Sequence, residues 1–110
     1  MRGSWMDEKR TIREYQMSNG QVWIVDNQYQ TVPCRAPDCE AVQYCRSTHI
    51  YRQTDQGFQL PEHHNNYRSD LEEFKKVQIA YIEGVAVREE ETDSGWILIM
   101  GKDVIGRAKA

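Results

Sequence analysis

The sequence lacks any long apolar segment and any recognisable secretion signal. No apolar run approaches the roughly 20 residues that a membrane-spanning helix requires. The N-terminal stretch MRGSWMDEKRTIREYQM has no apolar core of the kind that a secretory signal peptide carries. The cysteines number three, and an odd count without a signal favours a reducing compartment over a disulfide framework. We therefore expect a cytoplasmic protein that does not contact a membrane.

Motifs for common enzymatic reactions are also missing. The chain contains no phosphate-binding Walker loop, no glycine-rich dinucleotide turn and no H-E-x-x-H helix. Its formal net charge of −3 differs from the strongly basic balance of proteins that bind duplex nucleic acid. These absences predict a protein that is not an enzyme and does not bind duplex DNA. They also predict no cofactor, unless the cysteine-rich stretch described below holds zinc.

The remaining composition is that of one small globular domain. The 110 residues are 39% hydrophobic and 28% charged, which is enough apolar material for a single core. Residues 1–18 are expected to be an N-terminal leader or flexible arm, because MRGS is typical of expression-vector leaders. Residues 19–110 are expected to form a single compact domain.

Turn residues between β-prone segments predict two hairpins. In the N-terminal hairpin, residues 21–32 alternate around a polar DNQ turn. Near the C-terminus, residues 85–89 are expected to be a strand followed by the polar turn EETDSG, and residues 96–100 and 104–108 are expected to form the second hairpin around the turn GKD. The segment WILIM is apolar throughout, so we expect it to be a central strand covered on both faces.

Two segments have the features of helices. Asp38 is a suitable N-cap for a helix over residues 38–52. Ser69 and Glu72 form a capping box in front of a second helical pattern, which ends at Gly84. Residues 77–87 are also β-prone, so this segment either finishes the helix or forms a strand. These elements predict an α+β domain, in which the two hairpins form a small, mostly antiparallel sheet with one or two helices packed on one face.

The stretch CRAPDCEAVQYCRSTH, residues 34–49, contains all three cysteines and ends on a histidine. Cys34, Cys39, Cys45 and His49 have the spacing C-x4-C-x5-C-x3-H. Zinc is bound by thiolates and neutral imidazoles in a tetrahedron. The spacing resembles the CCCH class of zinc finger, a family of small single-stranded RNA binders, over 16 of the 110 residues. The resemblance implies a zinc site formed by these four residues.

The same resemblance implies an RNA-binding surface around the metal. CCCH fingers usually carry an aromatic residue between the last cysteine and the histidine, and RST stands there in this sequence. Tyr44 and Tyr51 flank the stretch and are the candidates for stacking on bases, while Arg46 and Arg52 are the candidates for phosphate contacts.

The alternative for this stretch is a plain helix over residues 38–52. At about 100° per residue, Cys45 and His49 share one face of such a helix, but Cys39 lies about 120° away from Cys45. A continuous helix therefore buries the cysteines as small apolar side chains and gathers no metal site. The sequence leaves both interpretations open.

Acidic residues and aromatic residues suggest a protein partner. The acidity of the chain lies late, in Glu89, Glu90, Glu91 and Asp93, and the sequence has three tryptophans and six tyrosines, types that are favoured at interface hot spots. The leading hypothesis is a small non-enzymatic regulator or inhibitor, of the kind that phages and other mobile elements encode, acting through protein–protein contact. The alternative hypothesis is the zinc-stabilised module that binds single-stranded RNA.

Overall fold

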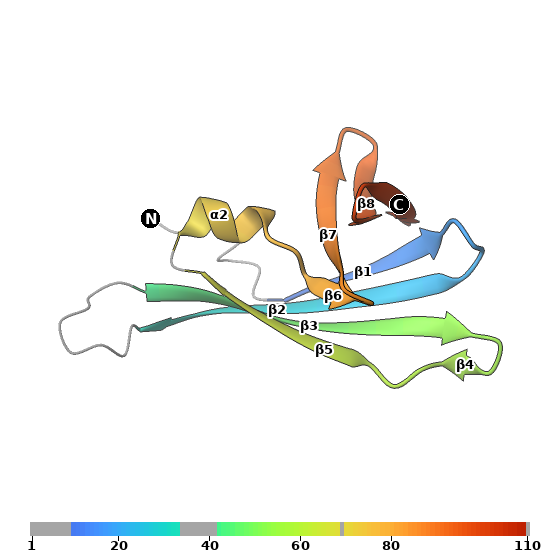
Figure 1. Ribbon diagram of the computed structural model, residues 1–110, viewed down its shortest axis with the longest axis horizontal. Coiled ribbons are helices and arrows are strands. Elements are labelled where there is room, and N and C mark those ends of the chain that lie inside the picture. Colours follow the sequence, from blue (N-terminus) through green and yellow to red (C-terminus); the bar gives the residue numbers. More distant parts are fainter. Residues whose placement is uncertain (1–9, 34–41, 69, 110) are drawn as a thin grey trace.

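Nine antiparallel strands form a continuous curled sheet in the computed structural model, which describes residues 10–33, 42–68 and 70–109 (Figure 1). The strands are β1 (Arg10–Met17), β2 (Val22–Pro33), β3 (Val42–Thr54), β4 (Gly57–Phe58), β5 (Glu62–Arg68), β6 (Ala80–Ile82), β7 (Val85–Thr92), β8 (Gly95–Met100) and β9 (Asp103–Ala108). Helix α2 (Leu71–Lys76) connects β5 to β6. The strand order is β4-β3-β2-β1-β9-β8-β7-β6, and β5 pairs with β3.

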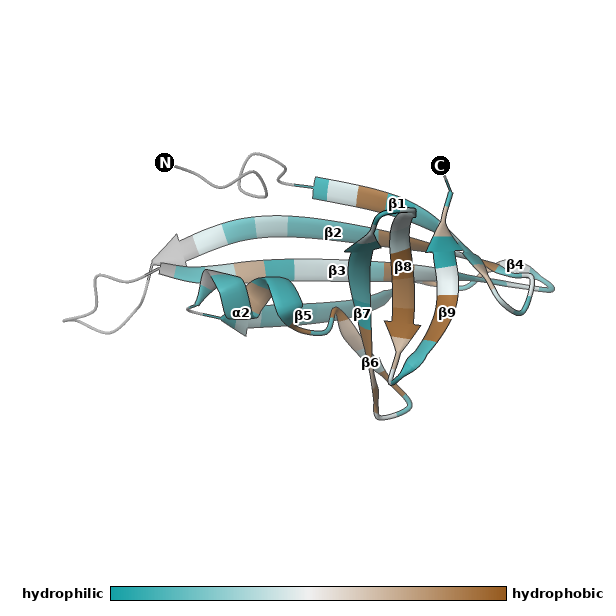
Figure 2. Cartoon of the chain, turned by 90° about the horizontal axis from the view of Figure 1, so that it is seen from above, coloured by the Kyte–Doolittle hydropathy of each residue, from teal (hydrophilic) through white to brown (hydrophobic). Residues whose placement is uncertain are grey.

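The sheet has two halves whose strands run in crossing directions, and this gives the sheet its curled shape. The long strands β1, β2, β3 and β5 run side by side, and β7, β8 and β9 pass across them (Figures 1 and 2). The halves join where β1 pairs with β9, with Met17 opposite Gly106. A Cβ atom at Gly106 would lie 2.6 Å from the sulfur of Met17, so a glycine permits this close approach. The result is an antiparallel half-barrel with one concave face.

The concave face has an apolar part and a polar part. Because side chains alternate between the two faces of a strand, every second residue of β1, β2, β3, β7 and β8 points inward. The apolar part is the core, which contains Tyr15, Met17, Trp23, Val25, Ile50, Ile79, Ala80, Ile82, Val87 and Leu98. The polar part continues along the same strands, so the curl of the sheet encloses charged side chains as well as a core.

The predicted α+β fold is wrong. The structure is nearly all sheet, and its helix α2 has only six residues. The prediction of a helix over residues 38–52 fails because the described part of that segment belongs to β3, where it pairs with β2 on one side and with β5 on the other. The helical spacing of its apolar residues was outweighed by long-range strand pairing. Residues 38–41 lie outside the described part of the chain.

The predicted N-terminal hairpin is also wrong. Residues 22–33 form one uninterrupted strand, β2, and the DNQ sequence lies inside it. Asp26 makes an ion pair with Arg10 on the neighbouring strand, with Nη2 to Oδ2 2.7 Å apart, and Asn27 is fully buried. The true turn lies at residues 18–21, between β1 and β2. The segment that the sequence set apart as an arm, residues 1–18, thus contributes strand β1, while residues 1–9 lie outside the described part.

The C-terminal elements agree with the sequence. Strands β7, β8 and β9 are joined by tight turns at residues 93–94 and 101–102, as the polar turn sequences predict. β8 lies between β7 and β9 and is apolar along most of its length (Figure 2). Of the two alternatives for residues 77–87, the strand is correct. Helix α2 stops at Lys76, β6 begins at Ala80 and β7 begins at Val85.

The N-cap of α2 is Asp70, one residue after the predicted position. The Asp70 carboxylate accepts a hydrogen bond from the backbone N–H of Glu73 at 2.9 Å, which is the role predicted for Ser69. Ser69 lies outside the described residues. Within residues 10–33, 42–68 and 70–109, no helix is both long and apolar enough to cross a membrane.

Candidate functional site

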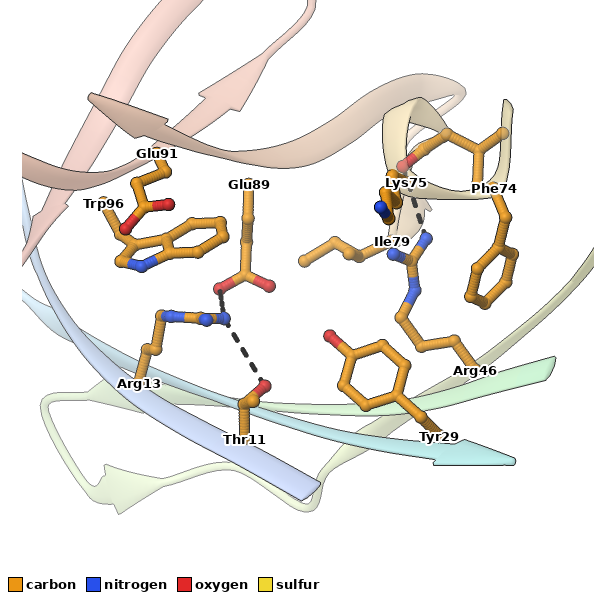
Figure 3. Close-up of a pocket in the computed structure, with 11 residues that line it drawn as sticks. Thr11, Arg13, Tyr29, Arg46, Phe74, Lys75, Ile79, Glu89, Glu91 and Trp96 are labelled. Carbon is orange, nitrogen blue, oxygen red and sulfur yellow. Dashed lines mark hydrogen bonds and ion pairs between the residues drawn. The ribbon is translucent and has the colours of Figure 1, made fainter. Parts of the chain in front are cut away.

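A cavity of about 440 Å³ lies in the polar part of the concave face (Figure 3). β1, β2, β3, β7, β8 and α2 each contribute to its wall. Its lining residues are Thr11, Arg13, Tyr29, Arg46, Phe74, Lys75, Val77, Ile79, Glu89, Glu91 and Trp96. These residues are far apart in the sequence and meet only because the sheet curls.

Glu89 is at the centre of a hydrogen-bond network in the wall of this cavity. Its side chain is 5% exposed. One carboxylate oxygen accepts from the side-chain amide of Asn27 at 2.7 Å, and the other accepts from the hydroxyl of Tyr15 at 2.5 Å and from the guanidinium of Arg13 at 3.2 Å. Asn27 in turn accepts from the hydroxyl of Thr48 at 2.7 Å. Both carboxylate oxygens are therefore occupied, and the negative charge is held by a cation and two neutral donors.

The network holds the Arg13 side chain in place and keeps the Tyr15 hydroxyl protonated. The Arg13 guanidinium lies 3.6 Å from the ring centroid of Trp96, so it is held between the Glu89 carboxylate and an indole face (Figure 3). Such a cation–π contact keeps the long side chain in one place. Burial raises the pKa of the Tyr15 phenol far above its usual value, and the adjacent negative charge of Glu89 raises it further. Tyr15 therefore stays protonated and acts as a fixed donor.

Arg46 forms the opposite wall of the cavity. Its residue is 6% exposed, and its Nη2 donates to the backbone carbonyls of Val77 at 3.3 Å and Gln78 at 2.8 Å. It also has a side-chain hydrogen bond with Tyr29, and its guanidinium lies 5.2 Å from the ring centroid of Phe74. Burial lowers the pKa of Arg46, against the opposing effect of Tyr29 and Glu89. The group remains a cation at neutral pH, because an arginine pKa starts above 12.

Helix α2 and the segment that follows it cover one side of the cavity. Phe74 is buried, and Lys75 lines the cavity from the same helix. Side chains of the sheet hold residues 77–79 in place. Arg46 donates to the carbonyls of Val77 and Gln78, and Asn66 donates to the carbonyl of Ile79 at 3.3 Å. The cover is therefore attached to β3 and β5 by side-chain hydrogen bonds.

The proposed zinc ligands are not brought together in the described part of the chain. Cys34 and Cys39 lie outside it. Cys45 and His49 are both on β3, four residues apart on an extended strand, which separates their Cα atoms by about 13 Å. Cys45 is buried, whereas the ring of His49 stacks on His63 with centroids 4.3 Å apart. No group of three or more potential metal ligands occurs among the described residues, so the zinc site stays a prediction.

The proposed RNA-contacting residues do not share one surface. By strand alternation Tyr44, Arg46 and Arg52 face the concave side, while Tyr51 faces the convex side. Arg46 lines the cavity, and Arg52 makes an ion pair with Glu62 at 2.5 Å. Tyr44 lies against Phe74 with ring centroids 6.1 Å apart.

The four acidic residues that were proposed to contact a protein partner also do not share one surface. Glu89 is the buried centre of the network, and Glu91 lines the cavity. Glu90 lies on the opposite face of β7, and Asp93 is in the exposed turn before β8. Of the tryptophans, Trp23 is in the core, Trp96 is in the cavity and Trp5 lies outside the described residues.

The chain was also compared with known proteins. No family model, curated protein or solved structure matches it. The functional interpretation therefore rests on the geometry of the cavity.

The sequence did not indicate the cavity, although it contained a signal. Arg13 lies between Thr11 and Tyr15 on one face of β1, and Glu89 follows Val87 on the inward face of β7. A charged residue in an inward position of a strand is a sign of a buried polar site. The signal can be used only once these segments are known to be strands and their inward faces are known.

Proposed function

We propose that the chain is a cytoplasmic, non-enzymatic binding protein that holds a small organic molecule in the cavity on its concave face. The observation that carries the proposal is the convergence of six separate elements around one space of about 440 Å³. Ligand sites are usually concave, have volumes of about 300–1,000 Å³, and combine aromatic or apolar walls with a few fixed polar groups. They also occur in the mouths of β-barrels.

The size of the cavity suits a ligand of two or three rings. A dry cavity of about 150 Å³ is large enough to hold benzene, and this cavity has about three times that volume. Trp96 offers aromatic surface, and Arg13, Tyr29 and Arg46 offer polar groups that are already held in place by the fold. A preorganised site loses little entropy when it binds.

The occupancy of Glu89 supports a role in binding over one in catalysis. A general base must be within hydrogen-bond reach of the proton that it removes. Both oxygens of Glu89 already accept hydrogen bonds from Arg13, Tyr15 and Asn27. The carboxylate is therefore committed to holding the wall of the cavity.

Filling the cavity tests the proposal. A panel of aromatic probes with one to three rings, including the neutral fluorophore N-phenyl-1-naphthylamine, would be titrated against wild type, Thr11→Phe and Thr31→Phe. Thr11 lines the cavity, whereas Thr31 is on the neighbouring strand, is exposed and does not line it. We expect Thr11→Phe to weaken binding at least ~10-fold and Thr31→Phe to leave it unchanged. Equal affinity in both variants, or no binding of any probe to wild type, would contradict the proposal.

A further inference from the structure

The cavity contains a buried cation whose partners, within the described part of the chain, are all neutral. Arg46 is 6% exposed, and its hydrogen bonds go to two backbone carbonyls and to Tyr29. Its Nε atom is buried and has no hydrogen-bond partner in residues 10–33, 42–68 and 70–109. Among the described residues, no carboxylate lies within ion-pair distance of it. A buried charge without an opposite charge is costly, and native proteins usually pair it.

The other charges in the cavity do not supply that pairing. Glu89 is already shared by Arg13, Tyr15 and Asn27. Three cationic and two anionic side chains line the space, which leaves one positive charge in excess. The two arginines thus differ, because Arg13 pairs with a carboxylate and Arg46 pairs with none that the structure describes.

We propose that Arg46 binds one anionic oxygen-bearing group of the ligand, a carboxylate, sulfonate or phosphate, while the ligand's aromatic body fills the cavity beside Trp96. This inference rests on the proposed function. The guanidinium is a planar fork of donors that suits such groups, and charge-assisted hydrogen bonds are the strong ones. Lys75, on the cavity side of α2, adds a second positive charge. Glu89 and Glu91 make a second negative charge on the ligand unfavourable.

A purely structural role explains only part of the contacts of Arg46. Its attachment to residues 77 and 78 uses one nitrogen, Nη2. That attachment requires a donor but not a charge, and it leaves Nε without a partner. A ligand anion accounts for the positive charge as well.

Two probes that differ by one sulfonate test this assignment. 8-Anilinonaphthalene-1-sulfonate has the same rings as N-phenyl-1-naphthylamine and one negative charge in addition. We expect wild type to bind the sulfonate ~10- to 100-fold more tightly than the neutral probe, as a charge-assisted hydrogen bond allows. The preference should decrease as salt concentration rises. In Arg46→Met, the ratio between the affinities for the sulfonate and for the neutral probe should fall to about one.

If Arg46→Met does not fold, the adjacent residues Lys75 and Lys76 provide a second test. Lys75 lines the cavity and Lys76, the next residue on α2, does not. Lys75→Gln should reduce the preference for the sulfonate ~2- to 5-fold, and Lys76→Gln should leave it unchanged. Equal binding of both probes by wild type, or an unchanged preference in Arg46→Met, would overturn the assignment and leave the proposed function standing. Failure of every probe to bind would overturn the proposed function itself.

Discussion

The substitution Glu89→Gln removes the charge at the centre of the cavity network and should strongly destabilise the protein. At 3.2 Å and an effective dielectric constant near 20, the attraction between Arg13 and Glu89 is about 5 kcal/mol before desolvation is subtracted. Breaking a buried pair typically costs 3–5 kcal/mol. Because the Arg13 side chain is 17% exposed and stays stacked on Trp96, we expect the lower end, about 3 kcal/mol. The amide also presents a donor to Tyr15 or Asn27, both of which donate in the native network.

Urea unfolding followed by circular dichroism measures this effect, and the next residue provides the control. Glu90 is exposed on the opposite face of β7, so Glu90→Gln should change the unfolding free energy by less than about 0.5 kcal/mol. With a urea dependence near 1.5 kcal/mol per molar, Glu89→Gln should lower the midpoint by about 2 M. Combining it with Arg13→Met should reveal a coupling energy of about 2 kcal/mol. If Glu89→Gln and Glu90→Gln had equal effects, the buried network would not exist as described.

Further predictions concern pH, the helix cap and the metal. Since burial raises the pKa of Tyr15 above its ordinary value near 10, its contribution to stability should be complete below about pH 10 and be lost above it at up to about 1.4 kcal/mol per pH unit. Tyr15→Phe should remove that slope in urea unfolding between about pH 9 and 11, and an unchanged slope would refute the assignment. Asp70→Ala should cost about 1 kcal/mol through loss of the cap on α2; a larger cost for Ser69→Ala would return the cap to Ser69. Elemental analysis of protein purified without chelator should find no stoichiometric zinc, because β3 keeps Cys45 and His49 about 13 Å apart; one zinc per chain, lost together with the fold on chelation, would restore the zinc finger.

The correct parts of the sequence interpretation depended on local signals. The C-terminal strands were found because each turn has its own polar or glycine residues, and Gly95 and Gly101 have the positive φ that such turns use. WILIM was found to be a central strand because an apolar run of that length needs cover on both faces. These signals need no knowledge of the rest of the chain.

The errors came from residues whose partners are distant in the sequence. The DNQ segment has the composition of a turn, yet Asn27 binds Glu89 across 62 residues and Thr48 across 21. The segment that becomes β3 has a helical spacing of apolar residues, yet residues 44–50 pair with β2 on one side and with β5 on the other. Local propensity could not reveal these contacts, because they exist only after the sheet has curled. For the same reason the cavity, which six elements build together, could not be predicted.

Nuclear magnetic resonance can show directly whether the concave cavity is the ligand site. In a ¹⁵N-labelled sample titrated with either naphthylamine probe, we expect shifts of the Trp96 indole N–H and of the Thr11 and Val77 amides, all on the cavity wall. The amides of the turns at residues 18–21 and 101–102, which do not line the cavity, should not move. Shifts confined to these turns, or no shifts at any probe concentration, would show that the cavity is not the ligand site.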